Sequence, residues 1–255
     1  MKSRLAILLL LTAPLAAQAA APGSDFAPCA DAAADPRLAG SLCAHFPAPD
    51  GKGSLFLREF PAANRSLGQV WLVAGESGAA LLPAIAGMRQ AFPGYDLILP
   101  DRRASGLAAA KDLRAEIDRY STGGATLLYG ATQGSEVVLK TLPLVRPRRV
   151  EAVILDSPPA IAVTTPGPAA AEQAQPVEPA LNTAPPRTLV LQGDTDAAPL
   201  PEIEKNAPVT TYTIEGAPSF LMMTVPECAA PLVHDFVEGA AAGGAPCAAR
   251  LSIRF

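Results

Sequence analysis

Residues 125–134 read ATLLYGATQG, an apolar run that ends in a turn framed by Gly130 and Gly134. The apolar part predicts a buried strand, and the periodicity of residues 134–144 predicts a helix. A sharp strand-to-helix turn leaves no room for side chains at its two flanks, which explains the glycines. The middle residue of this turn, Thr132, would then hold its hydroxyl above the edge of a sheet, close to the backbone N–H groups of the following helix.

The same alternation continues on both sides of this turn. Further strands are predicted at residues 54–60, 69–75, 95–101, 150–155, 187–192 and 210–215, and further helices at residues 81–92, 108–120 and 228–238. Continuous apolar strands separated by helices favour a mostly parallel α/β sheet covered on both faces. The 255 residues are 49% hydrophobic, enough for one sizeable core. Residues 157–186 are rich in Pro and Ala and predict an extended linker.

Residues 1–21 have the order of charge, apolar core and small residues that is typical of a secretory signal peptide. Lys2 and Arg4 precede the apolar run of residues 5–11, and Ala17-Gln18-Ala19 supplies the small residues. Spanning a bilayer takes about 20 apolar residues, so no membrane span is expected. We therefore expect one domain over residues 22–255 in a periplasmic or secreted protein.

Export changes the interpretation of the four cysteines, because disulfides persist in oxidising compartments. Cys29 and Cys43 flank one short segment, and Cys228 and Cys247 flank another. We predict these two local pairs among the three possible connectivities. Each bridge would constrain the unfolded chain by about 3 kcal/mol in the loop-entropy model. There is no Cys-x-x-Cys motif, so neither a metal site nor a cofactor is expected.

The charge of the chain limits its partners. A formal net charge of -4 and an isoelectric point near 5.3 argue against a nucleic-acid partner, which normally requires a basic face. A small molecule or another protein remains as the partner, and the sequence does not distinguish between them.

Three strand exits follow one another in an informative order, at residues 73–78 (VAGESG), 101–106 (DRRASG) and 129–134 (YGATQG). In this order they resemble the functional loops of the α/β-hydrolase fold. More closely, the chain is similar to exported proteases of the tripeptidyl aminopeptidase and proline iminopeptidase group. That group has a Gly-Gly-Pro-Gly oxyanion loop, an Asp-x-Arg-Gly-x-Gly loop and a Gly-x-Ser-x-Gly nucleophile elbow.

The resemblance implies a role for particular positions of this chain. Gly75, Glu76 and Gln133 would belong to the oxyanion loop, and Thr132 would take the nucleophile position. Asp196 would be the catalytic acid, with Asp194 as the weaker choice. The resemblance extends over nearly the whole mature chain apart from the linker.

The chain departs from that pattern at four places. Thr132 replaces serine, and its β-branch crowds a strained turn. The expected Gly-His pair is Gly216-Ala217, so the position of the general base holds a methyl group. Glu76 replaces a proline of the oxyanion loop, and residues 157–186 are too short for the lid of the family.

Neither remaining histidine replaces the missing base in this interpretation. His45 follows Cys43 and precedes the first sheet loop, and His234 lies opposite the apolar stripe of the helix at 228–238, where solvent is expected. We predict an exported pseudoenzyme that acts as a binding or structural module. A weakly active esterase-like or serine-protease-like hydrolase that uses Thr132 stays open as the alternative, and so does a structural remnant without a ligand.

Overall fold

The computed structural model describes residues 25–75, 77–102, 106–145, 150–159, 186–195, 208–240, 247 and 249–254. In this part of the chain, ten strands form one sheet in the order β1-β2-β3-β5-β4-β6-β7-β8-β9-β10. The strands are β1 (Ala27–Pro28), β2 (Leu42–Pro47), β3 (Ser54–Phe60), β4 (Gly68–Val73), β5 (Tyr95–Pro100), β6 (Ala125–Ala131), β7 (Ala152–Asp156), β8 (Arg187–Gly193), β9 (Val209–Ile214) and β10 (Ala249–Arg254).

The centre of the sheet, from β5 through β4, β6, β7 and β8 to β9, is parallel. The strands at its two ends, β1, β2 and β3 on one side and β10 on the other, pair antiparallel. Parallel neighbours share their carboxyl ends at one edge, so the loops after β4, β6, β7, β8 and β9 gather there. That edge carries the candidate site.

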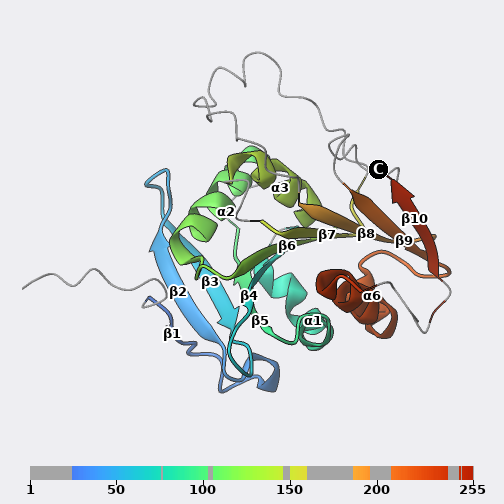
Figure 1. Cartoon of the computed structure of the whole chain (residues 1–255). Helices are drawn as coiled ribbons and strands as arrows, with labels where there is room; N and C mark the ends of the chain where they lie inside the picture. Colours follow the sequence, from blue (N-terminus) through green and yellow to red (C-terminus); the bar gives the residue numbers. More distant parts are fainter. Residues whose placement is uncertain are drawn as a thin grey trace, which may run out of the picture.

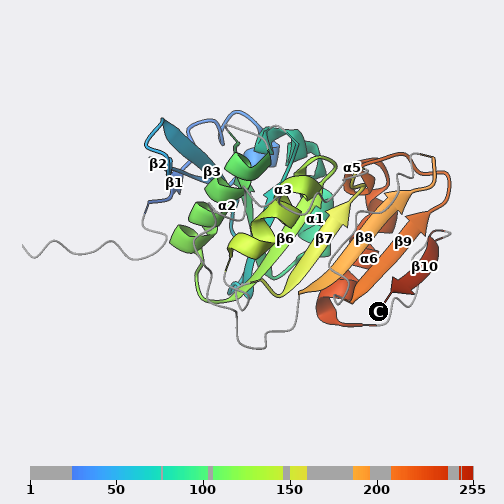
Figure 2. The ribbon, with the colours of Figure 1, turned by 90° about the horizontal axis from the view of Figure 1, so that it is seen from above.

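Helices cover both faces of the sheet, with α2 and α3 on one face and α1 and α6 on the other (Figures 1 and 2). The helices are α1 (Ile85–Ala91), α2 (Gly106–Tyr120), α3 (Gly134–Thr141), α5 (Leu221–Thr224) and α6 (Pro226–Glu238), with 3-10 turns at η1 (Pro36–Leu38), η2 (Gly78–Ala84) and η3 (Leu142–Leu144). None of the described helices combines the length and apolarity that a membrane crossing requires.

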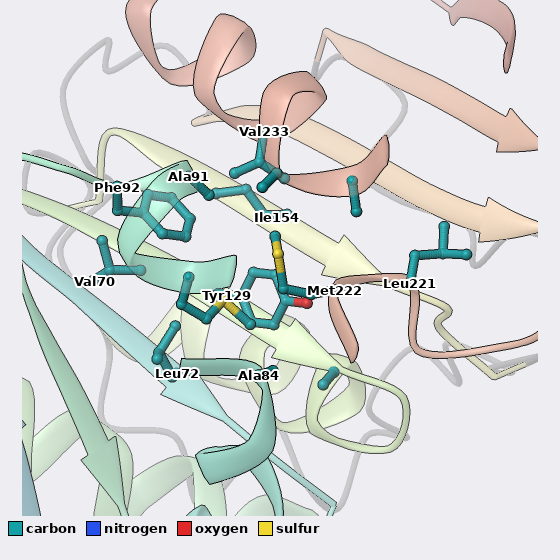
Figure 3. Close-up of a cluster of buried hydrophobic side chains, with 14 of the residues drawn as sticks. Val70, Leu72, Ala84, Ala91, Phe92, Tyr129, Ile154, Leu221, Met222 and Val233 are labelled. Atoms are coloured by element: carbon teal, nitrogen blue, oxygen red, sulfur yellow. The ribbon is translucent and has the colours of Figure 1, made fainter. Parts of the chain in front are cut away.

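Each face of the sheet has its own core, because successive side chains of a strand point to opposite faces. Under α2 and α3, Trp71, Ile98, Leu128 and Val153 pack together. Under α1 and α6 lies the second cluster, in which Tyr129 and Met222 are fully buried (Figure 3). The two clusters confirm the expectation of a mostly parallel sheet buried on both faces.

The sequence patterns located most elements and missed some. The helix predicted at residues 81–92 begins instead as the 3-10 turn η2, with Pro83 inside it, and becomes α-helical only at Ile85. A proline has no N–H for the helical ladder, which accounts for the difference. The strands β1, β2 and β10 and the short helix α5 were not predicted. Residues 1–21 and most of the linker prediction at 157–186 lie outside the described residues.

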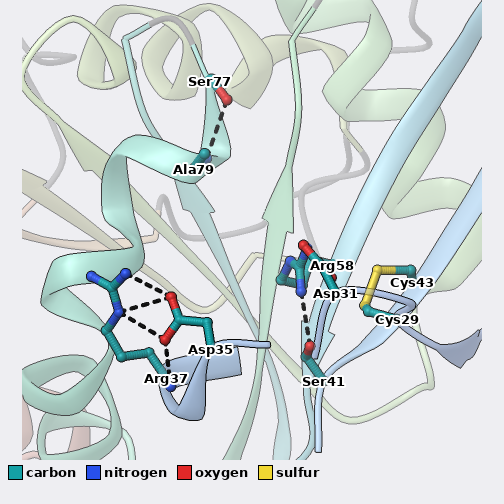
Figure 4. A network of polar contacts seen from close by, with 9 residues as sticks. All are labelled: Cys29, Asp31, Asp35, Arg37, Ser41, Cys43, Arg58, Ser77 and Ala79. Atoms are coloured by element: carbon teal, nitrogen blue, oxygen red, sulfur yellow. Dashed lines mark hydrogen bonds and ion pairs between the residues drawn. A yellow bond between two sulfur atoms is a disulfide. The ribbon is translucent and has the colours of Figure 1, made fainter. Parts of the chain in front are cut away.

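Both predicted disulfides are present, Cys29 to Cys43 and Cys228 to Cys247. The first joins the N-terminal segment to β2 (Figure 4). Beside it, the mostly buried Arg58 donates to Asp31 at 2.8 Å and to Ser41 at 2.9 Å. The hydrogen bond from Arg58 holds the pKa of Asp31 below its ordinary value. A covalent and an ionic contact therefore fix this edge of the sheet.

The environment of Glu59 in β3 favours the uncharged form of its carboxyl group. Burial, assisted by the nearby charge of Asp96, raises the pKa of Glu59 from 4.5 to about 7. Because this pKa is higher in the folded chain than in the unfolded one, the stability linked to Glu59 is complete below about pH 4.5 and is lost as the pH rises through 7.

We therefore expect Glu59→Gln to stabilise the protein at pH 8 by roughly 1 kcal/mol, a value discounted because Glu59 is only partly buried. At pH 4.5 the variant and the parent should be nearly equal. Urea denaturation at both pH values measures this, with Glu227→Gln on the surface as the matched control. Equal stability of variant and parent at pH 8 would contradict the role assigned to Glu59.

Candidate functional site at the carboxyl edge of the sheet

The turn between β6 and α3 has the geometry of a nucleophile elbow. Thr132 has a φ of 47°, a left-handed conformation that is rare for a β-branched residue. Its N–H donates to the carbonyl of Asp156 at 2.8 Å, and its carbonyl accepts from Ser135 N–H at 3.0 Å. In the part of the chain that the structure describes, the Thr132 hydroxyl has no hydrogen-bond partner.

The two glycines of the elbow are required by close packing. A Cβ on Gly134 would lie 2.0 Å from the carbonyl oxygen of Val73, and a Cβ on Gly130 would lie 2.6 Å from Cα of Ser135. Ser135 is itself fully buried and donates its hydroxyl to the carbonyl of Gly130 at 2.9 Å. The elbow is thus pressed against the end of β4, and the frame that the sequence suggested has a steric cause.

We predict that Gly134→Ala destabilises the protein by more than about 3 kcal/mol, because the added methyl group meets rigid backbone. Gln133→Ala, at an exposed neighbouring position, should change the stability by less than about 0.5 kcal/mol. Thermal and urea denaturation of the two variants distinguish them. Similar stabilities would show that the elbow is looser than its packing indicates.

Gly75, two residues after the end of β4, faces the elbow directly. A Cβ on Gly75 would be 3.3 Å from both Cβ and Oε1 of Gln133. The structure thus brings together Gly75, Gln133 and Thr132, three of the positions that the resemblance implied. Glu76 and Asp196, the other two, lie outside the described residues.

The exit loops of β8 and β9 also meet at this edge. The carboxylate of Asp194 accepts from Gly216 N–H at 2.6 Å, and the hydroxyl of Thr195 donates to the carbonyl of Ala217 at 2.8 Å. Ala217 is only 2% exposed, and a Cβ on Gly193 would lie 2.0 Å from its carbonyl oxygen. The loop expected to hold an acid and the loop expected to hold a base are therefore adjacent. In the second of these loops, the position expected for the base holds the buried methyl group of Ala217.

A buried carboxylate connects this loop region to the elbow. Asp156, at the end of β7, is fully buried and accepts four hydrogen bonds. The donors are the Tyr129 hydroxyl at 2.5 Å, the Ser157 hydroxyl at 2.9 Å, and the N–H groups of Leu221 and Met222, both at 2.9 Å. Burial raises the pKa of Asp156, while these hydrogen bonds oppose that rise. Its oxygens are occupied by structural contacts.

Two residues of the network around Asp156 have strained backbone conformations. Ser157 has a φ of 52° and Phe220 a φ of 61°, and Phe220 N–H donates to the Ser157 hydroxyl at 2.7 Å. Left-handed conformations of this kind cost on the order of 1–3 kcal/mol each and persist only where neighbouring contacts enforce them. The sequence pattern did not reveal this network, although an acid directly after an apolar strand was its visible signal.

Replacement of Asp156 by Asn should destabilise the protein by about 2 to 4 kcal/mol, because the amide N–H₂ would face donors inside the core. Tyr129→Phe removes one donor and leaves three, so about 1 to 2 kcal/mol is expected. Asp118→Asn on the surface of α2 is the matched control, at less than about 0.5 kcal/mol. A stability of Asp156→Asn close to that of the control would refute the structural role of Asp156.

Both histidines lie far from the elbow. His45 is exposed on β2, four strand positions from β6, which at about 4.8 Å per strand is on the order of 19 Å. His234 lies in the last turns of α6, where Arg187 at the start of β8 binds the carbonyls of Phe236 and Val237. That end of α6 is at the amino edge of the sheet, whereas the elbow is at the carboxyl edge.

The expectation that His234 is solvated is only partly correct. The side chain is half-buried, and its Nδ1 atom is enclosed without a hydrogen-bond partner in the described structure.

As for metal ligands, the described residues contain one group with mutually close ligand atoms, Cys29, Asp31 and Cys43. Its two cysteines form a disulfide.

Comparison with solved structures places this geometry among known folds. The chain is similar to the Cfl2 protein of Burkholderia cenocepacia (17% identity, TM-score 0.57, 79% of this chain and 97% of that chain). It is similar to a serine hydrolase of Cycloclasticus zankles (14%, 0.56, 78% and 99%) and to a carboxylesterase of Bacillus subtilis (14%, 0.51, 79% and 93%). The chain spans about half the length, 46%, of some other hydrolases that it matches.

No family model and no curated protein matches the sequence. At these identities the likeness concerns the fold alone. The sheet order, the glycine-framed elbow and the loops that meet at the carboxyl edge agree with it: the protein has the α/β-hydrolase fold.

Proposed function

We propose that this protein is an exported, catalytically inactive protein with the α/β-hydrolase fold, which acts as a binding or structural module. The observation that carries the proposal is Ala217. It occupies the loop next to the β8 exit, where the resemblance implies a histidine, and its methyl group can neither accept nor donate a proton.

The remaining imidazoles do not supply the base. A general base must lie within about 3 Å of the hydroxyl that it deprotonates, or one water away. The strand that carries His45 is roughly 19 Å from the strand of the elbow, which is too far for proton transfer from Thr132. His234 lies at the opposite edge of the sheet. Asp156, the buried carboxylate whose backbone carbonyl accepts from Thr132 N–H, already accepts four hydrogen bonds at its side-chain oxygens.

The size of the loss supports inactivity. Hydrolases that lose triad members keep roughly 10³ to 10⁴-fold acceleration over water from binding and the oxyanion hole, and lose about 10⁶. Here the serine and the histidine are replaced together, at Thr132 and Ala217. The fold remains, with its loops at the carboxyl edge of the sheet, where proteins with open α/β sheets bind their ligands.

Export is part of the proposal. The charge and apolar order of residues 1–21 favours it, and both cysteine pairs are closed, which agrees with an oxidising compartment. The periplasm and the extracellular medium are both compatible with these features.

The alternative function is a weak esterase-like or serine-protease-like hydrolase that uses Thr132. One observation favours it: Thr132 keeps the left-handed conformation of a nucleophile, and its hydroxyl is not engaged within the described residues. Asp196 would serve as the acid in that mechanism, but the base has no candidate among the two histidines.

Incubation of the purified mature protein with a serine-directed fluorophosphonate and with p-nitrophenyl acetate tests the proposal. We expect no covalent adduct by intact-mass spectrometry, and the same rate of ester hydrolysis for the parent and for Thr132→Ala. A serine esterase treated in parallel controls the reagents. A rate at least about tenfold above that of Thr132→Ala would refute inactivity and establish the alternative.

A further inference from the structure

An open cavity of about 660 Å³ lies at the amino edge of the sheet, away from the elbow. Its walls are residues 65–68, which lead into β4, and residues 122–124, which lead into β6, and Asp96 of β5 lines it as well. These three strands are parallel, so all of them begin at this edge. The seven residues of β6 separate it from the elbow by about 20 Å.

Asp96 gives this cavity an anionic lining. The residue is only 8% exposed, and its Oδ1 accepts from Ala62 N–H at 2.8 Å. Among the described residues it has no cationic partner. A buried carboxylate without a counter-charge is unfavourable, so the site favours a ligand that brings positive charge and N–H donors.

Two further polar side chains, outside the lining of the cavity, face the same side of the sheet as Asp96. Gln69 pairs in register with Asp96 and therefore faces the same side of the sheet. It is 3% exposed, and while its Nε2 donates to the Tyr120 carbonyl at 3.0 Å, its buried Oε1 has no partner in the described structure. Glu59 faces this side too, and Asp96 contributes to the raised pKa of its carboxyl group.

A positively charged side chain, that of Arg65, lies at the rim of the cavity. Arg65 lines it, is exposed, and has no acidic partner within the described residues. The two wall segments are packed closely, since a Cβ on Gly124 would lie 2.7 Å from the carbonyl oxygen of Leu67. The close packing of the wall segments forms the cavity in advance, with the Asp96 carboxylate in its lining and the exposed Arg65 guanidinium group at its rim.

We propose that this cavity binds a small zwitterion of the amino-acid class, with the ammonium group against Asp96 and the carboxylate toward Arg65. An ammonium group supplies one positive charge and three donors to Asp96, whose carboxylate accepts from Ala62 N–H and has no cationic partner among the described residues. A guanidinium group pairs with a carboxylate through two parallel hydrogen bonds. A calcium ion fits less well, because it requires six to eight oxygen ligands.

This site is independent of the loss of catalysis proposed above, because it shares no residue with the elbow. Binding is measured on the mature protein by isothermal titration calorimetry with glycine, L-serine, L-lysine and L-glutamate. Methylamine, acetate and calcium chloride are the single-charge controls. We expect at least one amino acid to bind at least about tenfold more tightly than methylamine or acetate.

Asp96→Asn keeps the Oδ1 acceptor for Ala62 and should weaken that binding at least about tenfold. Arg65→Ala, at an exposed position where folding is not at risk, should weaken it several-fold, and Thr132→Ala should leave it unchanged. The proposal is overturned if none of the four amino acids binds at millimolar concentration, if calcium alone binds, or if Arg65→Ala binds as tightly as the parent. Loss of binding in Thr132→Ala would place the ligand at the elbow instead.

Discussion

The hydrogen bonds to the Asp156 carboxylate hold together the parts of the carboxyl edge that lie far apart in the sequence. Tyr129 comes from the strand of the elbow, Ser157 from the end of β7, and Leu221 and Met222 from the start of α5. A fully buried carboxylate is tolerated only when donors surround it. Because the donors here belong to three elements, the carboxylate fixes the elbow, the loop of Ala217 and the helices α5 and α6 relative to one another.

This constraint explains how the edge keeps the geometry of a nucleophile elbow while Thr132 and Ala217 stand where the resemblance implies a serine and a histidine. The left-handed Thr132 lies in a glycine frame that the close packing of β4, β6 and α3 requires. Position 217 is constrained by burial alone: where the resemblance implies a histidine, the methyl group of Ala217 is part of the core.

The amount that the sequence could predict differs between fold and site. The central strands, the helices α2, α3 and α6 and both disulfides were found from periodicity and cysteine spacing, because these signals are local. The strands β1, β2 and β10 were missed, since edge strands depend on partners elsewhere in the chain. The elbow was found from two glycines, whereas the polar side chains of Gln69, Asp96 and Glu59 come together only through strand register.

The sequence by itself determined the alternation of strands and helices, the glycine-framed turn and the absence of a histidine at position 217, because each depends on residues that are close in the chain. The tertiary structure alone decided that Asp156 is a buried structural carboxylate, that both histidines are remote from Thr132, and that Asp96 lines a cavity at the amino edge. The physical reason is that burial and counter-charge are properties of neighbours in space, and a parallel sheet brings together neighbours from distant parts of the chain.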